Sequence, residues 1–250
     1  MIATNCITAI GKLQGLEQKN VFPFPFVNPI CKVSMERHKQ ASDIKVTASG
    51  EMVFPHLDRH ERFALPYFYR QQLFMTRIGL ISDTHNTLDE TVFVHFKNCH
   101  EIWHAGDFGS LEIANRLQEK TGLPLRGVFG NIDGRDVRSV YPETLVWNCE
   151  DVKVLMKHIG GYPGRYAPGV KQELIETGAR LFISGHSHIL KVMYDDKINC
   201  LHMNSGAAGN QGWHKVKTIL RFAIDGTEIK DCEVIELGMR GGPLSPAGGA

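Results

Sequence analysis

Five short polar loops recur along the chain at nearly even spacing, each directly after a run of apolar residues. Their leading residues lie 24, 24, 27 and 28 positions apart and are Asp83, Asp107, Asn131, His158 and His186. One strand–helix–strand step takes about 25–30 residues. The spacing therefore predicts that each loop returns to the carboxyl edge of a sheet, where α/β proteins place their binding and catalytic sites.

The segments between these loops alternate between strand-like and helix-like patterns. Short apolar runs predict strands over 77–81, 101–103, 125–129, 145–147, 152–156 and 181–184. Helical periodicity predicts helices over 88–97, 111–120 and 170–177, the second of them after the candidate N-cap Ser110. Antiparallel strand pairs are predicted for 189–194 with 198–203 and for 218–224 with 228–235. This order predicts an α/β domain with two mixed sheets packed between helices.

The two ends of the chain lack this regular pattern. Residues 1–74 include the stretch Phe-Pro-Phe-Pro-Phe at 22–26 and carry nine basic against six acidic residues. We expect an N-terminal extension over 1–74, for which disorder, a docking arm and an upstream translation start unused by the native protein all stay open. A domain is expected over 75–237 and a flexible Gly/Pro-rich tail over 238–250. A chain that starts at Met75 is expected to keep its activity, and loss of folding on that truncation would refute this expectation.

Composition argues against several classes of protein. The net charge of +1 disfavours a protein that mainly coats nucleic acid or an anionic membrane. No apolar run approaches the roughly 18 residues of a spanning helix, and the first twenty residues lack the pattern of a secretory signal. The six cysteines are scattered without a C-x-x-C pair, which is typical of a reducing compartment. We expect a cytoplasmic protein with no membrane or specific nucleic-acid partner, and a homo-oligomer stays open.

The polar loops carry residue types that bind divalent metals. The seven candidate ligands are Asp83, His85, Asp107, Asn131, His158, His186 and His188. Ligands two positions apart project to one side of an extended backbone. Several ligands follow a glycine, which allows close approach of the backbone or a positive φ angle; the glycines are Gly106, Gly130 and Gly185. Such donors suit Mn, Ni, Fe, Co or Zn, with Mn preferred here. Seven ligands suit two ions that share Asp107, and such a pair performs phosphoester hydrolysis.

The order of these motifs resembles the calcineurin-like metallophosphoesterases. The motifs are D-x-H at 83–85, G-D at 106–107, G-N-x-D at 130–133, a lone His before glycines at 158–161 and G-H-x-H at 185–188. The short domain, over about residues 75–237, is similar to the compact YfcE-type phosphodiesterases of bacteria and archaea. The resemblance implies a four-layer α/β/β/α sandwich with a dinuclear site: Asp83, His85, Asp107 and His188 on one ion, and Asp107, Asn131, His158 and His186 on the other. It also implies that a hydroxide bridging the two ions attacks phosphorus, with Asp107 and Asn131 among the catalytic residues.

Two positions depart from the family pattern. Ile132 stands where many members have a His that donates a proton to the leaving group. Without that acid, which contributes about 10²–10⁴-fold, good leaving groups should be favoured. Asp133 either substitutes as a catalytic acid or hydrogen-bonds a ligand from behind. Ser205 stands where relatives often have Pro, and we expect no consequence.

Other polar residues have weaker signals. Four further histidines are expected to occupy ordinary surface or core positions: His95, His100, His202 and His214. His104 is a candidate to support a ligand. Tyr162 and Arg165 either line a substrate pocket, with Arg165 binding phosphate, or belong to a surface loop. Asp136, between two arginines, is expected to be a surface charge.

The leading hypothesis is a metal-dependent phosphodiesterase that acts on a small phosphoester. The main alternative is a non-catalytic scaffold that binds proteins on the same fold, as the small retromer subunit does. Retention of all seven ligands favours the enzyme. A nuclease is a third alternative, disfavoured because residues 75–250 carry 19 basic against 21 acidic residues.

Overall fold

The computed structural model of the chain describes residues 45–46, 52–53 and 75–241. Residues 76–241 form one compact unit. In a separate unit, β1 (Lys45–Val46) pairs antiparallel with β2 (Met52–Val53). The rest of the expected N-terminal extension, and the expected tail beyond residue 241, lie outside the described residues.

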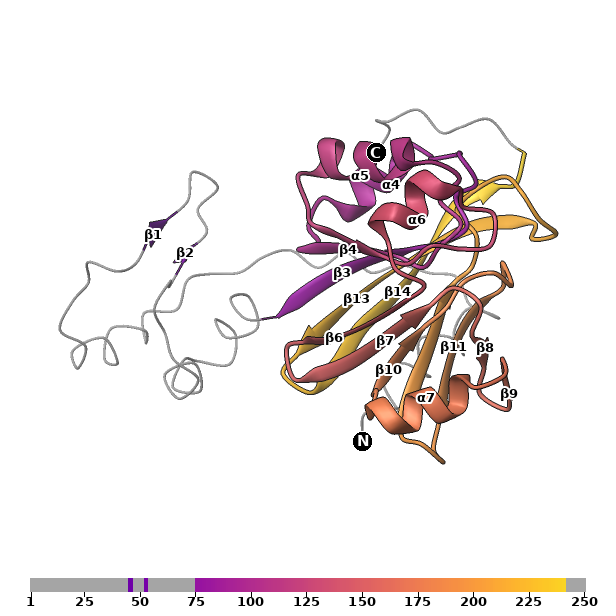
Figure 1. The fold of residues 1–250 in the computed structure, drawn as a ribbon. Coiled ribbons are helices and arrows are strands. Elements are labelled where there is room, and N and C mark those ends of the chain that lie inside the picture. The colour runs from indigo at the N-terminus through magenta and orange to yellow at the C-terminus, as the bar shows by residue number, and fades with distance from the viewer. Residues whose placement is uncertain (1–44, 47–51, 54–74, 242–250) are drawn as a thin grey trace, which may run out of the picture. The chain divides into compact units, whose positions relative to one another are not determined.

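Residues 76–241 contain two five-stranded mixed sheets (Figure 1). The first has the strand order β14-β13-β3-β4-β5, with β3 (Thr76–Ile81), β4 (Glu101–His104), β5 (Leu125–Gly127), β13 (Val216–Asp225) and β14 (Glu228–Met239). The second has the order β11-β12-β10-β7-β6, with β6 (Thr144–Cys149), β7 (Val152–Lys157), β10 (Leu181–Ile183), β11 (Leu190–Asp195) and β12 (Cys200–Ser205). Strands β3, β4 and β5 are mutually parallel, as are β7, β10 and β12.

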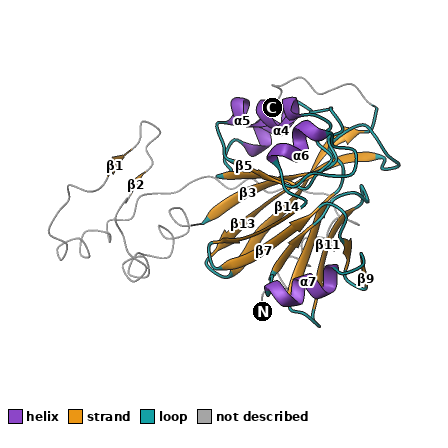
Figure 2. Cartoon of the chain, in the orientation of Figure 1, coloured by secondary structure: helices purple, strands orange, loops and turns teal. Residues whose placement is uncertain are grey.

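Helices cover the outer face of each sheet (Figures 1 and 2). The first sheet is covered by α4 (Thr91–Phe96), α5 (Leu111–Thr121) and α6 (Arg135–Val140), and the second by α7 (Val170–Thr177). The molecule thus has the layer order α/β/β/α, which confirms the predicted fold class. A short hairpin of β8 (Gly161–Tyr162) and β9 (Arg165–Tyr166) follows β7.

Alternating side chains along the strands build separate apolar cores on the two faces of each sheet. In β10, Leu181 and Ile183 point into the core between the sheets, whereas Phe182 packs in the core beneath α7. In β3, Leu80 joins the core between the sheets and Ile81 the core beneath α4 and α5. This period of two is the one expected of strands. Burial on both faces explains why these strands read as continuous apolar runs.

Most predicted elements are present, with differences at their ends. Helix α7 has the predicted bounds, whereas α4 begins at Thr91 rather than 88, because the Asp89 carboxylate accepts hydrogen bonds from the N–H and hydroxyl of Thr91. Ser110 lies at the N-cap of α5, but its side chain forms no capping hydrogen bond. Helix α6 and the β8–β9 hairpin were not predicted, and β14 continues to Met239, into the segment expected to be a tail. Among the described residues, no helix combines the length and apolar character that crossing a membrane requires.

Candidate metal centre

The five polar loops meet at one end of the sandwich, but they come from both sheets. Those led by Asp83, Asp107 and Asn131 follow β3, β4 and β5 of the first sheet, and those led by His158 and His186 follow β7 and β10 of the second. The expectation of a single sheet edge is therefore wrong in detail. Parallel strands in each sheet bring their carboxyl ends together, and stacking of the two sheets adds the loops of one to those of the other.

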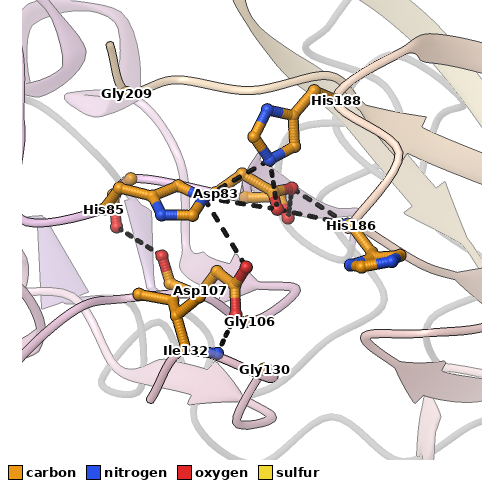
Figure 3. A network of polar contacts seen from close by, with 12 residues as sticks. Asp83, His85, Gly106, Asp107, Gly130, Ile132, His186, His188 and Gly209 are labelled. Atoms are coloured by element: carbon orange, nitrogen blue, oxygen red, sulfur yellow. Dashed lines mark hydrogen bonds and ion pairs between the residues drawn. The ribbon is translucent and has the colours of Figure 1, made fainter. Parts of the chain in front are cut away.

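One group of potential ligands combines loops from both sheets. The ligand atoms of Asp83, His85, Asp107 and His188 all lie within 4.8 Å of one another. His188 Nε2 is 3.2 Å from Asp83 Oδ1, and His85 Nε2 is 3.5 Å from Asp107 Oδ2 and 3.3 Å from His188 Nε2 (Figure 3). Metal–ligand bonds of about 2.0–2.2 Å place neighbouring donor atoms about 3–3.5 Å apart. The spacing of these atoms suits a single cation between them.

A second group shares one member with the first. The ligand atoms of Asp107, His158 and His186 also lie within 4.8 Å of one another. His158 Nε2 is 3.2 Å from Asp107 Oδ2, and the rings of His158 and His186 lie edge to face with centroids 5.4 Å apart. Asp107 thus belongs to both groups. The Asp and His members of the two groups are those of the two ligand sets that the family resemblance implied.

Most of these residues have a backbone conformation that is uncommon for side chains with a Cβ. Positive φ angles of 46–64° occur at Asp83, His85, Asp107, His186 and His188. The expectation that extended backbone aligns the paired ligands is therefore wrong: the loops turn through left-handed residues instead. Such conformations cost about 1–3 kcal/mol each and persist where the surrounding structure imposes them. Here the Asp83 N–H donates to Gly106 O and the His85 N–H to Asp107 O, each at 3.0 Å.

The three glycines before candidate ligands are required for the predicted reasons. Gly106 has φ +98°, and a Cβ there would lie 2.6 Å from His158 Nδ1. A Cβ on Gly130 would lie 2.0 Å from Asp107 Oδ1, and one on Gly185 would lie 2.2 Å from the Ser82 hydroxyl. Backbone from three loops thus packs directly against the ligand side chains, at a distance that excludes any other residue type.

The contacts of the two His158 ring nitrogens indicate whether the cluster suits a cation. His158 Nδ1 donates to the carbonyl oxygen of Ala105 at 2.7 Å, which leaves Nε2 as the atom that faces Asp107. Nε2 is buried and has no hydrogen-bond partner. A neutral imidazole nitrogen and a carboxylate oxygen are both acceptors, so their approach to 3.2 Å requires a positive charge, either a proton or a metal ion. A carbonyl that orients the far nitrogen is the usual support of a metal-binding His.

The pKa values follow from burial and from the facing charges. Burial opposes protonation of His158, but the Asp107 and Asp83 carboxylates outweigh it and raise its pKa. The contact with Asp83 raises the pKa of His188, while burial lowers that of His85. Burial alone would raise the pKa of Asp107, yet His158, the Ile132 N–H and His85 together hold it below its usual value. The lowered pKa of Asp107 favours its anionic form, and the raised pKa of the adjacent His158 favours the charged form of that ring.

Comparison with known proteins assigns the family. Residues 76–227 match the model of the calcineurin-like phosphoesterase superfamily domain. The chain belongs to this superfamily. A probable metallophosphoesterase of Methanothermobacter thermautotrophicus is 34% identical over 116 residues, which make up 44% of this chain and 66% of that protein, just under two thirds of its length.

Solved structures share the fold of this phosphoesterase domain at low sequence identity. An archaeal phosphodiesterase has a TM-score of 0.54 at 22% identity, over 65% of this chain and 100% of that one. Vacuolar Protein Sorting 29 from Cryptosporidium parvum has a TM-score of 0.53 at 18% identity, over 66% of this chain and 99% of that one. Both likenesses concern the fold alone.

In this phosphoesterase domain the loop at 130–133 lies against Asp107. The Ile132 N–H donates to Asp107 Oδ1 at 3.1 Å (Figure 3), and the Asn131 side chain is exposed. The buried Asp133 carboxylate accepts hydrogen bonds from the N–H groups of Asp107, Gly109 and Gly130. Of the two roles considered for Asp133, this geometry favours support of a ligand from behind over proton donation.

Several residues that support the candidate metal centre carried little or no signal in the sequence. Arg138 donates to the carbonyl oxygens of Asp133, Gly130 and Asn131 and lies over the Phe129 ring, so that it holds the whole loop from outside. The Asn204 side chain donates to Gly185 O and accepts from the Gly206 N–H. Arg138 lies on helix α6, which was not predicted, so its role could not be read from spacing.

The weaker candidates divide between support and surface. His104 is buried, accepts from the Gly106 N–H and contacts the Thr84 hydroxyl, as expected of a supporting residue. His214 was expected to have no role, yet its ring lies 5.4 Å from that of His188, edge to face. His202 is a core histidine and His100 is exposed.

The remaining candidates lie away from the ligand contacts described above. Arg165 and Asp136 are exposed, as expected of surface residues. Tyr162 is half-buried beneath the Lys191 ammonium group. His95 is half-buried on α4, and burial lowers its pKa. Ser205 is buried in β12, where the backbone carbonyl accepts from the Thr218 hydroxyl.

Proposed function

We propose that this chain is a metal-dependent phosphodiesterase that hydrolyses a small phosphoester at the cluster around Asp107. The observation that carries the proposal is the membership of Asp107 in two groups of potential ligands, each of which combines loops from both sheets. A carboxylate shared in this way is the feature that a two-ion site needs. Two divalent ions bound there would act as Lewis acids on the phosphoester and lower the pKa of a water.

The protein's own part in such a reaction is to hold charge and geometry. The Asp83 and Asp107 carboxylates supply the negative charge that attracts cations, and Ala105 O and the Ile132 N–H orient His158 and Asp107. The backbone hydrogen bonds between loops leave little freedom to reorganise. A site whose ligands are fixed in advance pays no reorganisation cost during the reaction.

The proposal includes a preference for good leaving groups. Ile132 presents an aliphatic side chain where a proton donor would otherwise stand, and Asp133 is held by three backbone N–H groups. Aryl esters, whose leaving groups need no proton, should therefore be hydrolysed faster than alkyl esters. We also propose Mn²⁺ as the resident ion, because carboxylate, imidazole and amide donors suit it. We further propose that the protein is located in the cytoplasm.

The test combines metal analysis with hydrolysis of bis-p-nitrophenyl phosphate in the presence of Mn²⁺ or Ni²⁺. We expect bound metal and turnover in the wild type, and loss of both in Asp107→Ala. Asp196→Ala is the matched control, since it removes an exposed carboxylate from the turn between β11 and β12. Equal rates in the wild type and Asp107→Ala would contradict the proposal, as would no rate in either.

Because the fold resembles that of Vacuolar Protein Sorting 29, the alternative of a non-catalytic scaffold is also considered. On that alternative the loops present a surface to another protein and the cluster need not support turnover. The same assay separates the two, because a scaffold would show no phosphoester hydrolysis even when metal analysis finds the ions bound.

A further inference from the structure

Large apolar side chains are exposed on the loops that carry the candidate metal ligands. Ile132 follows Asn131, Ile159 follows His158 and Ile189 follows His188. These isoleucines are 44%, 45% and 60% exposed, and Trp213 is 99% exposed. Exposure of one such side chain is ordinary, whereas several around one site call for an explanation.

Trp213 belongs to the same place although it lies far from the motifs in sequence. Its neighbour Gly212 packs so closely on His188 that a Cβ there would lie 1.9 Å from Nδ1. Its other neighbour, His214, lies edge to face with the His188 ring. Both neighbours of Trp213 therefore contact the candidate ligand His188, Gly212 through its backbone and His214 through its ring, and the indole is exposed to solvent.

Four of the exposed large apolar side chains lie on these loops or next to them. Ten large apolar side chains are exposed in the described part of the chain. Six are spread over helices and strands: Val94, Val140, Val146, Ile175, Met193 and Met239. The other four lie next to candidate ligands or their contacts. Within the described residues, no Lys or Arg side chain forms a hydrogen bond or ion pair with any of the six Asp and His residues of the cluster.

We propose that Ile132, Ile159, Ile189 and Trp213 form an apolar rim that binds a planar aromatic ester group of the phosphodiester substrate. This inference rests on the proposed function and deepens it. The cluster accounts for the phosphate, and the ester groups attached to phosphorus must then extend past the loops that hold the ligands. An indole free on both faces can stack on an aromatic ring, and the aliphatic side chains can cover the ring edge.

The kinetic test compares two substrates with one leaving group. Phenyl p-nitrophenyl phosphate and methyl p-nitrophenyl phosphate both release p-nitrophenol and differ only in the group that stays. We expect Trp213→Ser to lower kcat/KM about 3- to 10-fold for the phenyl ester, mainly through KM, the range that an aromatic contact supplies. The methyl ester should change less than about twofold. Val94→Ser, an exposed apolar position on α4, should change neither. An equal effect of Trp213→Ser on both esters would overturn the rim.

A binding measurement separates failure of the rim from failure of the proposed function. Acrylamide quenches the fluorescence of exposed Trp213 in preference to that of buried Trp103. With Zn²⁺ added, phenylphosphonate should protect the wild type from quenching, methylphosphonate should not, and Trp213→Ser should show no protection by either. Absence of protection by phenylphosphonate would refute the rim. If neither diester is hydrolysed while protection is observed, the phosphodiesterase proposal fails and the aromatic binding site stands.

Discussion

The carboxylate of Asp133 accepts a hydrogen bond from the backbone N–H of Asp107 at 3.0 Å. The same oxygen accepts from the Gly130 N–H at 2.7 Å, and the other oxygen accepts from the Gly109 N–H at 2.8 Å. One buried side chain thus ties the loop after β4 to the loop after β5. Because Asp107 is the residue shared by both ligand groups, its position depends on Asp133.

Asp133→Asn is expected to weaken metal binding about 10- to 100-fold, the usual cost of removing a support behind a ligand. The amide directs an NH₂ group at backbone N–H donors, so at least one of the three hydrogen bonds is lost. Titration calorimetry with Zn²⁺ measures the effect. The opposite pattern, with unchanged affinity and slower hydrolysis only of poor leaving groups, would identify Asp133 as a proton donor instead.

Gly130→Ala is expected to abolish metal-dependent activity and to lower the stability of the folded protein, because the added Cβ would also lie 2.5 Å from the backbone nitrogen of Asp107. The added Cβ would lie 2.0 Å from Asp107 Oδ1, so the shared carboxylate must move. Gly134→Ala is the matched control in the same loop, because its Cβ would meet only the end of the exposed Asp136 side chain, at 2.9 Å. Metal content and circular dichroism of both variants check the expectation, and a fully metal-loaded Gly130→Ala protein would disprove it.

Lys217→Met is expected to destabilise the protein by about 3 kcal/mol or more, the cost of leaving a buried charge unpaired. Lys217 Nζ lies 2.9 Å from Asp89 Oδ2, and both side chains are buried. Urea denaturation measures the loss. Asp89→Asn combined with Lys217→Met leaves no unpaired charge and should recover part of the stability. If the double variant is less stable than the single one by the full cost of Asp89→Asn, the two residues are not coupled.

His202 is expected to make the folded state sensitive to acid. Burial, aided by the charge of Lys191, lowers the pKa of His202 to about 3 in the folded protein, whereas an unfolded His has a pKa of about 6.5. Between these values the unfolded chain binds a proton that the folded protein does not, so stability falls as pH falls from about 6.5 toward 3. The slope from this one group is at most about 1.4 kcal/mol per pH unit.

Urea denaturation of the wild type and His202→Gln at several pH values between 4 and 7 tests this dependence. The difference in unfolding free energy between the two proteins should change with pH, because groups common to both cancel. His100→Gln removes an exposed histidine and should leave the dependence as it is. A difference that stays constant over this range would exclude His202 as a source of acid sensitivity.

The order of elements followed from periodicity, and departures arose where tertiary contacts outweigh local pattern. The predicted helix 170–177 has the observed bounds because Gly169 and Gly178 flank it and Val170 and Leu174 face one core. Helix α6 was missed because only Val137 of its six residues is buried, so it has no apolar stripe to detect. The start of α4 was misplaced because Asp89 forms hydrogen bonds that replace those of a further helical turn.

Residue type and spacing alone selected seven candidate ligands, and six of them lie in the two groups of potential ligands: Asp83, His85, Asp107, His158, His186 and His188. The side chain of the seventh, Asn131, is exposed. Only the tertiary structure decided how these residues are supported. Three features depend on residues distant in sequence: the division of the loops between two sheets, the left-handed backbone of the ligands, and the contacts made by Arg138 and His214. Local sequence determines which strands form and where they end, whereas the stacking of one sheet on another determines which loop ends meet.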